Sequence, residues 1–206
     1  MKTTKISIGL FASGLLLSSF IFFSNRACQK ELNNSGAVPQ TEEIHWHTFQ
    51  EAVQLSQKEK RKFFIDVYTS WCGWCKVMEK NTFSNPVVIK YINEKFYAVK
   101  LDAEMKDTIN FDNKLFVNPN PSIPRSTHQL ASALLSNKLS YPTTVYLDEN
   151  FSLLTQVPGY LQPAQIEPML KYFGDDAYKT VKWEEYTATF KGEITSPPPA
   201  VTAPAH

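Results

Sequence analysis

The chain of 206 residues has little net charge, only three cysteines and no internal repeat. A net charge of +1 gives no electrostatic reason to expect nucleic acid as a partner. Three cysteines cannot supply the four ligands of a structural zinc site by themselves. The hydrophobic fraction of 43% and the aromatic fraction of 13% nevertheless suffice for a core, and the length suits one domain with appendages.

One long apolar run stands at the N-terminus. Two lysines precede an uncharged, mostly apolar stretch over residues 6–23, which is typical of an export signal or an N-terminal membrane anchor. Its length is near the lower limit for crossing a bilayer. Cys28 follows and is a possible lipidation site, although Asn25-Arg26-Ala27 departs from lipoprotein signals. We therefore expect residues 1–27 to be a signal peptide or membrane anchor, with the rest of the chain outside the cytoplasm.

Composition also marks the segments around the expected domain. Residues 28–42 are mostly polar and are predicted to form a flexible linker. The chain ends in a segment rich in proline, alanine and threonine, which predicts a disordered tail over residues 192–206. Between these segments we expect a main domain over residues 43–174 and a C-terminal helical extension over residues 175–191.

Apolar periodicity predicts alternating helices and strands in the main domain. Helices are expected over residues 46–58, from the cysteine pair to about Thr82, from Asn85-Pro86 onward, over 126–138, over 163–173 and around 183–190. Pro168 should kink or weaken the helix that contains it. Strands are expected over 63–68, 96–101, 143–147 and 151–157, the last two as an antiparallel pair. The pattern indicates an α/β sandwich with a mixed sheet.

The main chemical signal is Trp71-Cys72-Gly73-Trp74-Cys75, directly after a buried strand. Cys72 is expected at the N-terminus of a helix, where free N–H groups and the helix dipole favour a thiolate. Such a site lowers a thiol pKa from ~8.5 into the range ~3.5–7.5. The junction therefore indicates thiol–disulfide chemistry. The alternative is half of a zinc site, whose further ligands would come from Cys28, His45, His47, His128 and His206.

Three separated motifs resemble the thioredoxin superfamily over residues 44–173, namely FFIDVYTSWCGWCK, FYAVKLDAE and SYPTTVYLDE. Within it, NTFSNPVVIKYINEKF is similar to the C-terminal domain of membrane thiol-disulfide interchange proteins and to small secreted thioredoxin-like proteins. The resemblance implies a thioredoxin-like fold with a central mixed β-sheet flanked by helices. Residues 106–125, with a small hairpin around Asp112-Asn113, would be an insertion before the cis-proline loop.

The resemblance also implies roles for individual residues. Cys72 would be the exposed nucleophile that attacks a client disulfide, and Cys75 the resolving thiol, the two cycling through a redox-active disulfide. Asp66 would be a buried carboxylate beneath the pair, able to accept a proton from Cys75. Pro142 would be the cis-proline beside the site, and the backbone of Tyr141 would bind an extended substrate.

Further residues are expected around the pair. Trp71 and Trp74 are expected to contact partners, Trp74 from an exposed turn, and Lys100 matches a lysine near the buried carboxylate. His128 could lie near the active site, whereas His45-Trp46-His47 is expected to be an exposed segment leading into the first helix. Gly73-Trp74 differs from the Gly-Pro of thioredoxin and the Pro-His of strong oxidases, so the direction of electron flow stays open.

These observations predict an exported, membrane-tethered thiol-disulfide oxidoreductase of the periplasm or cell envelope. It would act as a reductase on client proteins with cysteines or disulfides. It would use no bound cofactor and no metal, because Cys72 and Cys75 carry the electrons, and a membrane electron-donor protein would return the pair to the dithiol. The alternatives are a disulfide oxidase or isomerase, or a non-catalytic binding module that uses the thioredoxin surface and its insertion.

Overall fold

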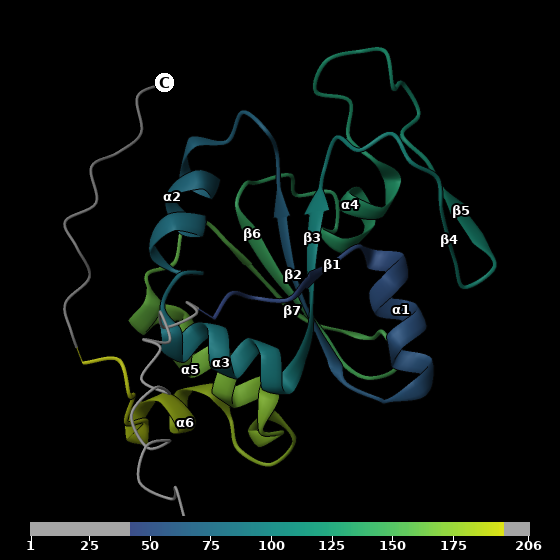
Figure 1. Cartoon of the computed structure of the whole chain (residues 1–206). Coiled ribbons are helices and arrows are strands. Elements are labelled where there is room, and N and C mark those ends of the chain that lie inside the picture. Colours follow the sequence, from purple (N-terminus) through teal and green to yellow (C-terminus); the bar gives the residue numbers. More distant parts are fainter. Residues whose placement is uncertain (1–41, 196–206) are drawn as a thin grey trace, which may run out of the picture. The chain divides into compact units, whose positions relative to one another are not determined.

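The computed structural model describes residues 42–195. These residues build a five-stranded sheet in the order β1-β3-β2-β6-β7 (Figure 1). The strands are β1 (Trp46–His47), β2 (Lys62–Tyr68), β3 (Phe96–Asp102), β6 (Thr143–Leu147) and β7 (Leu153–Pro158). Because β2 pairs parallel with β3 and antiparallel with β6, the predicted mixed sheet is confirmed.

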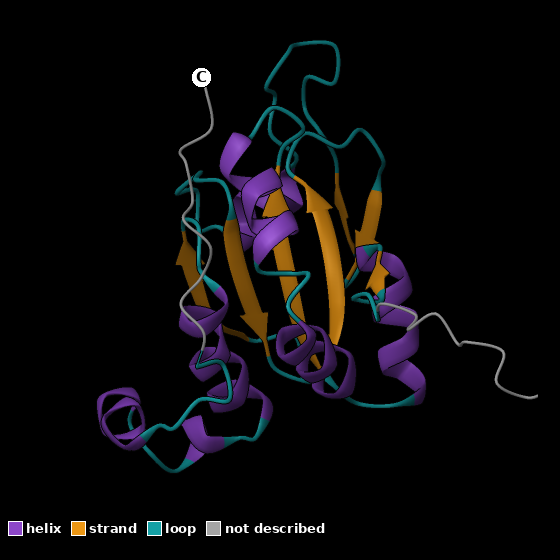
Figure 2. Cartoon of the chain, turned by 60° about the vertical axis from the view of Figure 1, so that its left-hand side comes forward, coloured by secondary structure: helices purple, strands orange, loops and turns teal. Residues whose placement is uncertain are grey.

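Helices cover both faces of the sheet (Figure 2). The helices are α1 (Phe49–Lys58), α2 (Gly73–Asn81), α3 (Pro86–Lys95), α4 (Gln129–Leu134) and α5 (Pro163–Gly174). Side chains of β2 alternate between the two faces: Phe64 packs in the core shared with α2, α3 and α5, whereas Phe63 and Ile65 pack in the core shared with α1 and α4. Asp66 has the same parity as Phe64, so its side chain faces α2.

The insertion contains the expected hairpin. Strands β4 (Ile109–Phe111) and β5 (Lys114–Phe116) pair antiparallel around Asp112 and Asn113, both in the left-handed region with φ of 50° and 57°. Two consecutive left-handed residues are what a tight two-residue hairpin turn requires. The chain then continues to α4 through residues 117–128, a segment that we call the return loop.

The structure corrects three sequence-based expectations about helices. The first helix begins at Phe49 instead of residue 46, because Thr48 and Glu51 form a capping box. Trp46 and His47 are not an exposed leader: they form β1, half-buried and paired with β3. The helix expected over 126–138 is only Gln129–Leu134. Pro168 lies inside α5, as expected, and the helix runs on to Gly174.

The C-terminal extension packs against α5. It contains a short 3-10 helix, η1 (Ala177–Lys179), and α6 (Trp183–Thr189). The backbone N–H groups of Glu193 and Ile194 donate to the buried carboxylate of Glu167 at 2.6 and 3.1 Å. Residues 192–195, expected as the start of a disordered tail, are therefore held against the domain.

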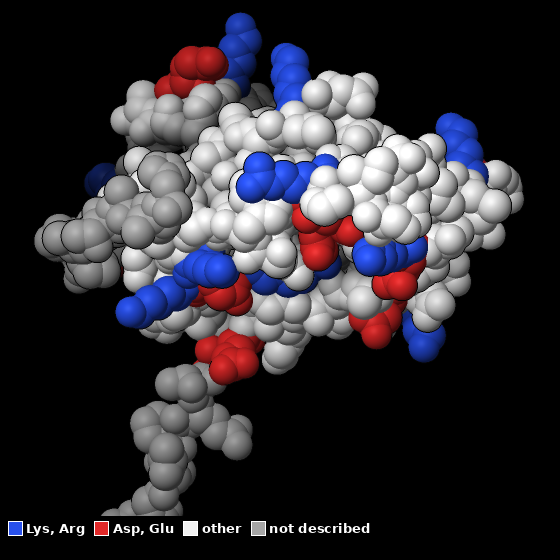
Figure 3. Space-filling view, turned by 90° about the horizontal axis from the view of Figure 1, so that it is seen from above, with Lys and Arg blue, Asp and Glu red and all other residues white. Residues whose placement is uncertain are grey.

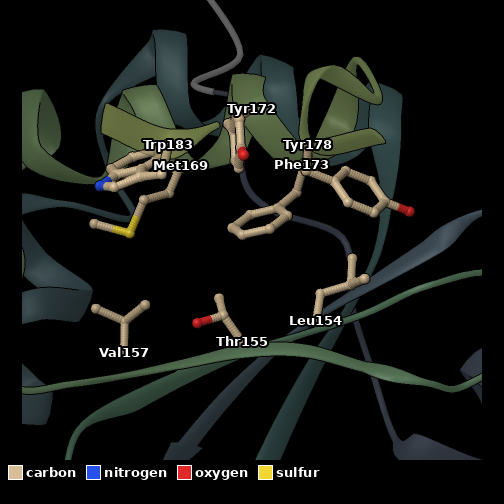
Figure 4. Close-up of a pocket in the computed structure, with 8 residues that line it drawn as sticks. All are labelled: Leu154, Thr155, Val157, Met169, Tyr172, Phe173, Tyr178 and Trp183. Atoms are coloured by element: carbon tan, nitrogen blue, oxygen red, sulfur yellow. The ribbon is translucent and has the colours of Figure 1, made fainter. Parts of the chain in front are cut away.

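An apolar pocket lies between α5, the extension and β7 (Figure 4). Aromatic side chains from α5 and the extension point across it toward side chains of β7. Its lining residues are Leu154, Thr155, Val157, Met169, Tyr172, Phe173, Tyr178 and Trp183. The extension thus adds aromatic surface to the core beneath α5.

No helix between residues 42 and 195 is long and apolar enough to cross a bilayer. The apolar stretch 6–23, Cys28 and most of the expected linker lie outside the described residues, as do residues 196–206. The expected signal or anchor, the lipidation site and the remainder of the tail therefore stay predictions.

Candidate active site at the start of α2

The cysteine pair lies where β2 leads into α2. Cys72 is the N-cap of α2, and its Sγ accepts a hydrogen bond from the backbone N–H of Cys75 at 3.1 Å. The two cysteines form a disulfide, with their Cα atoms 5.3 Å apart. In the reduced protein the same N–H group would stabilise a thiolate on Cys72, because hydrogen bonds to the charged form favour it.

The structure corrects the expected exposure of the nucleophile. Cys72 is only 5% exposed, and Cys75 is 6% exposed. As the helix cap, Cys72 directs its sulfur at the first turn of α2, where it is bonded to Cys75. In the disulfide form, therefore, the two cysteines are about equally buried.

A buried carboxylate faces the same helix. Asp66 is 1% exposed and lies beside Lys100 in the parallel pairing of β2 with β3. Lys100 Nζ donates to Asp66 Oδ2 at 2.7 Å and also to Glu79 of α2. Asp66 Oδ1 has no hydrogen-bond partner within residues 42–195. One oxygen of this carboxylate is thus committed to Lys100 and the other is free to take a proton.

Burial dominates the ionisation of Asp66. Desolvation raises the pKa of Asp66 above its ordinary value, although the charge and hydrogen bond of Lys100 oppose the shift. Desolvation alone would lower the pKa of Lys100, but Asp66 and Glu79 outweigh it and the pKa of Lys100 is raised. Lys100 therefore stays charged between the two carboxylates.

Sequence reasoning found Asp66 and Lys100 but missed Glu79. The available signal was its spacing, since Glu79 follows Cys75 by four residues and lies one helical turn further along α2. The Nζ of Lys100 also lies 4.8 Å from the ring centroid of Trp46 and 5.2 Å from that of Tyr68. Aromatic rings therefore pack around the ammonium group of Lys100.

The fold brings Pro142 and Tyr141 to the cysteine pair. The Tyr141–Pro142 bond is cis, as expected. The ring of Tyr141 meets the ring of Trp71 edge-on, with centroids 6.0 Å apart. Trp71 is 49% exposed and donates its Nε1–H to Glu104 Oε1 at 2.7 Å. An exposed indole fixed on two sides therefore stands directly before Cys72.

Trp74 differs from the expectation of an exposed turn residue. It lies in the first turn of α2 and is half-buried. Its ring packs against that of Tyr160, from the segment after β7, with centroids 5.4 Å apart. The two tryptophans thus have different surroundings, and Trp71 is the more exposed of the two.

His128 is a structural residue of the return loop. Its side chain is 0% exposed; Nδ1 accepts from the N–H of Leu130 at 3.1 Å, so Nε2 carries the proton and donates to the carbonyl of Asp107 at 3.0 Å. Burial lowers the pKa of His128, which favours this neutral form. His128 therefore caps α4 and ties the return loop to Asp107.

The zinc alternative gains no support from the described residues. Between residues 42 and 195 no group of three or more His, Cys, Asp or Glu side chains is arranged to hold a metal ion. Two of the candidate ligands, Cys28 and His206, lie outside this part of the chain.

Comparisons with known proteins place this site in a wider context. Uncharacterized protein B0495.5 of Caenorhabditis elegans is 37% identical over 68 residues, which are 32% of this chain and 9% of the relative. The thiol:disulfide interchange protein DsbD of Actinobacillus pleuropneumoniae is 25% identical over 139 residues, 65% of this chain and 20% of DsbD. The chain thus spans a small part of the length of these curated relatives.

Among solved structures, a DsbH oxidoreductase has 19% sequence identity, covers 73% of this chain and 95% of its own, and gives a TM-score of 0.47. The family model Thioredox_DsbH, described as "Protein of unknown function, DUF255", matches residues 37–169. Because this match covers more than half of the chain, the protein belongs to the Thioredox_DsbH family, within the thioredoxin superfamily.

Proposed function

We propose that this protein is a thiol–disulfide oxidoreductase that reduces protein disulfides outside the cytoplasm through Cys72 and Cys75. The observation that carries the proposal is the joint arrangement of a cysteine pair at the N-terminus of α2 and a buried carboxylate, Asp66, that faces this helix. Membership of the family and similarity to DsbD support oxidoreductase chemistry in general terms.

The reaction is two successive thiol–disulfide exchanges. The Cys72 thiolate attacks one sulfur of the client disulfide, a mixed disulfide forms, and the other client sulfur leaves as a thiolate and takes up a proton. The Cys75 thiolate then attacks the Cys72 sulfur, which releases the second client thiolate and closes the Cys72–Cys75 disulfide. Two electrons pass from the pair to the client.

The second exchange needs a base for the proton of Cys75. Asp66 suits this role because Oδ1 lacks a partner among the described residues and because burial raises its pKa toward the working range of a general base. Lys100 links Asp66 to Glu79, which is half-exposed on α2. These ion pairs hold the Asp66 carboxylate in place and leave Oδ1 available for the proton.

Client binding would use the surface beside Cys72. Trp71 and Tyr141 supply aromatic contact area, and the backbone at Pro142 would pair with an extended client segment. Trp74 would support this surface from the opposite side of the pair through its contact with Tyr160. The clients are proteins with exposed disulfides.

The cellular setting belongs to the same proposal. An exported chain, tethered through residues 1–27 or through a lipid on Cys28, would work in the periplasm or cell envelope. A membrane electron-donor protein would then reduce the Cys72–Cys75 disulfide after each cycle. In the alternative function, a disulfide oxidase or isomerase, the same cysteine pair would have a redox potential that favours the disulfide as the starting form.

Turnover tests the enzymatic part. With dithiothreitol as electron donor, the protein should accelerate the reduction of insulin disulfides. The Cys72→Ser variant should lose this activity, and the Cys75→Ser variant should accumulate a mixed disulfide with the client. No acceleration by the wild type, together with partner binding that survives Cys72→Ser, would instead identify a binding module.

The redox potential tests the direction. A glutathione titration followed by the fluorescence of Trp71 and Trp74 should give a potential near ~−270 mV for a reductase. A value near ~−120 mV would favour the oxidase alternative.

A further inference from the structure

We propose that Arg125, in the return loop, recognises a carboxylate of the client next to the disulfide bond that is reduced. This inference rests on the proposed function and names a chemical feature of its substrates. It makes the insertion, which the chemistry of the cysteine pair does not use, a specificity element of the same site.

Arg125 stands on the residue that precedes the nucleophile. Its guanidinium carbon lies 4.8 Å from the ring centroid of Trp71, over the face of the indole. Trp71 is adjacent to Cys72 in the chain and is the exposed aromatic residue of the site. A client segment that contacts Trp71 on its way to Cys72 would therefore lie close to Arg125.

The return loop holds Arg125 in a fixed and uncommon backbone conformation. Its φ is 64°, in the left-handed region that residues other than glycine seldom adopt. The neighbouring Ser126 is bound twice to the buried side chain of Asn118: Ser126 Oγ donates to Oδ1 at 2.6 Å, and Nδ2 donates to the Ser126 carbonyl at 2.7 Å. Backbone strain that surrounding bonds maintain is typical of functional sites.

Both ends of this part of the loop are anchored as well. Asn118 Nδ2 also contacts the carbonyl of Met105 at 3.3 Å, and the N–H of His128 donates to the carbonyl of Ala103 at 2.7 Å. These bonds tie the loop to the chain segment that follows β3. Arg125 is thus presented to Trp71 by a supported loop and not by a free one.

The guanidinium has donors to spare. Within residues 42–195 no carboxylate lies within salt-bridge distance of Arg125, although the side chain is exposed. Glu104, the acidic neighbour of the same indole, already accepts the Nε1–H of Trp71. A guanidinium stacked on an aromatic face keeps its in-plane N–H groups available, and a carboxylate matches their geometry in a bidentate pair.

The charge distribution on the surrounding surface favours recognition by Arg125 alone over attraction by a large basic patch. Figure 3 views the domain from the end at which β2 and β3 terminate; basic and acidic side chains lie next to one another there, amid wide uncharged areas. This face has no continuous basic field that would attract any acidic protein. Discrimination would then depend on one carboxylate placed beside the client cysteine.

Matched peptide disulfides test the proposal. We would measure kcat/KM for the reduction of peptides that differ only in Glu, Gln or Lys beside the cysteine. The wild type should prefer the Glu peptide over the Lys peptide by about tenfold, as one charge-assisted hydrogen bond allows. The Arg125→Gln variant should lose the preference, and Arg125→Glu should reverse it. Using the ratio within each variant removes any general change in activity or folding.

The control is Lys58→Glu, which makes the same charge change at the exposed end of α1 and should leave the ratio as in the wild type. Equal rates for all three peptides, or a Glu preference that survives Arg125→Glu, would overturn the inference while leaving the reductase intact. Failure of the wild type to reduce any peptide would instead remove the proposed function itself.

Discussion

At the scale of single residues, Asp66 is both the proposed base of the reaction and a residue whose burial costs stability. An acid with a raised pKa holds its proton to higher pH when folded than when unfolded, so the folded state is favoured at low pH. That advantage is lost as pH rises from the ordinary value of 3.8 through the raised pKa of Asp66. At neutral pH the ionised carboxylate is therefore a burden on the fold.

The Asp66→Asn variant should accordingly resist denaturant better than the wild type at pH 7, with Lys100 retaining Glu79 as a partner. The difference should shrink as pH falls through the raised pKa of Asp66 toward 3.8, and it should reach its minimum below that value. Urea unfolding across pH provides the measurement, and Asp112→Asn, in the exposed hairpin turn, is the control expected to show neither effect. Lower stability of Asp66→Asn at pH 7 would show that pairing with Lys100 outweighs desolvation.

His128 should give the opposite pH dependence. Because burial lowers its pKa, the unfolded chain takes up the proton first, and stability is lost as pH falls from 6.5 through the lowered pKa of His128. His128→Asn keeps a side-chain cap but loses the bond to Asp107, which should cost about 1–3 kcal/mol near pH 8. Thermal unfolding from pH 8 to pH 5 should show that the difference in stability between His128→Asn and the wild type becomes smaller. The control is His45→Asn, at an exposed position, which should unfold like the wild type throughout.

At the scale of elements, α5 contains a proline that weakens its backbone hydrogen bonding. Pro168 lies inside the helix and cannot donate a backbone hydrogen bond, yet the helix runs on to Gly174. The apolar face of α5 includes Ile166 and Leu170, both nearly fully buried, and this packing compensates for the missing bond.

Pro168→Ala should therefore raise the free energy of unfolding by about 1–3 kcal/mol. Pro163→Ala, at the first turn of the same helix where the N–H has no helical partner, should change it far less. Chemical denaturation of both variants gives the comparison. A loss of stability in Pro168→Ala would mean that the half-buried ring contributes more by packing than it costs in the helix.

The helices and strands also show which parts of the fold local sequence patterns can predict. Strand β2 was predictable because Phe63, Phe64 and Ile65 form a continuous apolar run, and the hairpin because Asp112-Asn113 tolerates the left-handed turn. Strand β1 was not, since two residues have no period and Trp46 fits helical spacing equally well. Its identity depends on pairing with Ala98 of β3, a contact distant in sequence.

The same limit applies to the candidate site. Cys72, Cys75, Asp66 and Pro142 could be named because short motifs carry them. Glu79 and Arg125 could not, because their partners, Lys100 and Trp71, are defined only when separate segments meet in the fold.

At the scale of the whole molecule, the C-terminal extension is expected to be part of the cooperative domain. Lys62, almost fully buried at the start of β2, pairs with Asp176 of the extension as well as with Glu149, both at 2.7 Å. Buried Glu167 likewise receives N–H groups from Glu193 and Ile194. Removing the extension would leave two buried charges with fewer partners.

A chain ending at Gly174 should therefore lose about 1.5–3 kcal/mol of unfolding free energy for each of these charges, the range for hydrogen bonds to charged groups. A chain ending at Thr195 should match the full-length protein. Denaturation midpoints of the two truncations distinguish the cases. Equal midpoints would mean that the domain is complete at α5, as the sequence-based boundary at residue 174 implies.

The nearly complete shelter of Cys72 and Cys75 has a consequence for rates. Because neither cysteine is more than 6% exposed, a dilute small thiol such as glutathione should reduce this disulfide more slowly than a docked protein does. The dithiothreitol-driven assay and the glutathione titration therefore need enough thiol and enough time to overcome that difference. A protein that docks on Trp71 and Tyr141 arrives already aligned. The cysteine pair therefore equilibrates slowly with the small thiols of the surrounding solution. Its oxidation state depends mainly on the proteins that have docked on it.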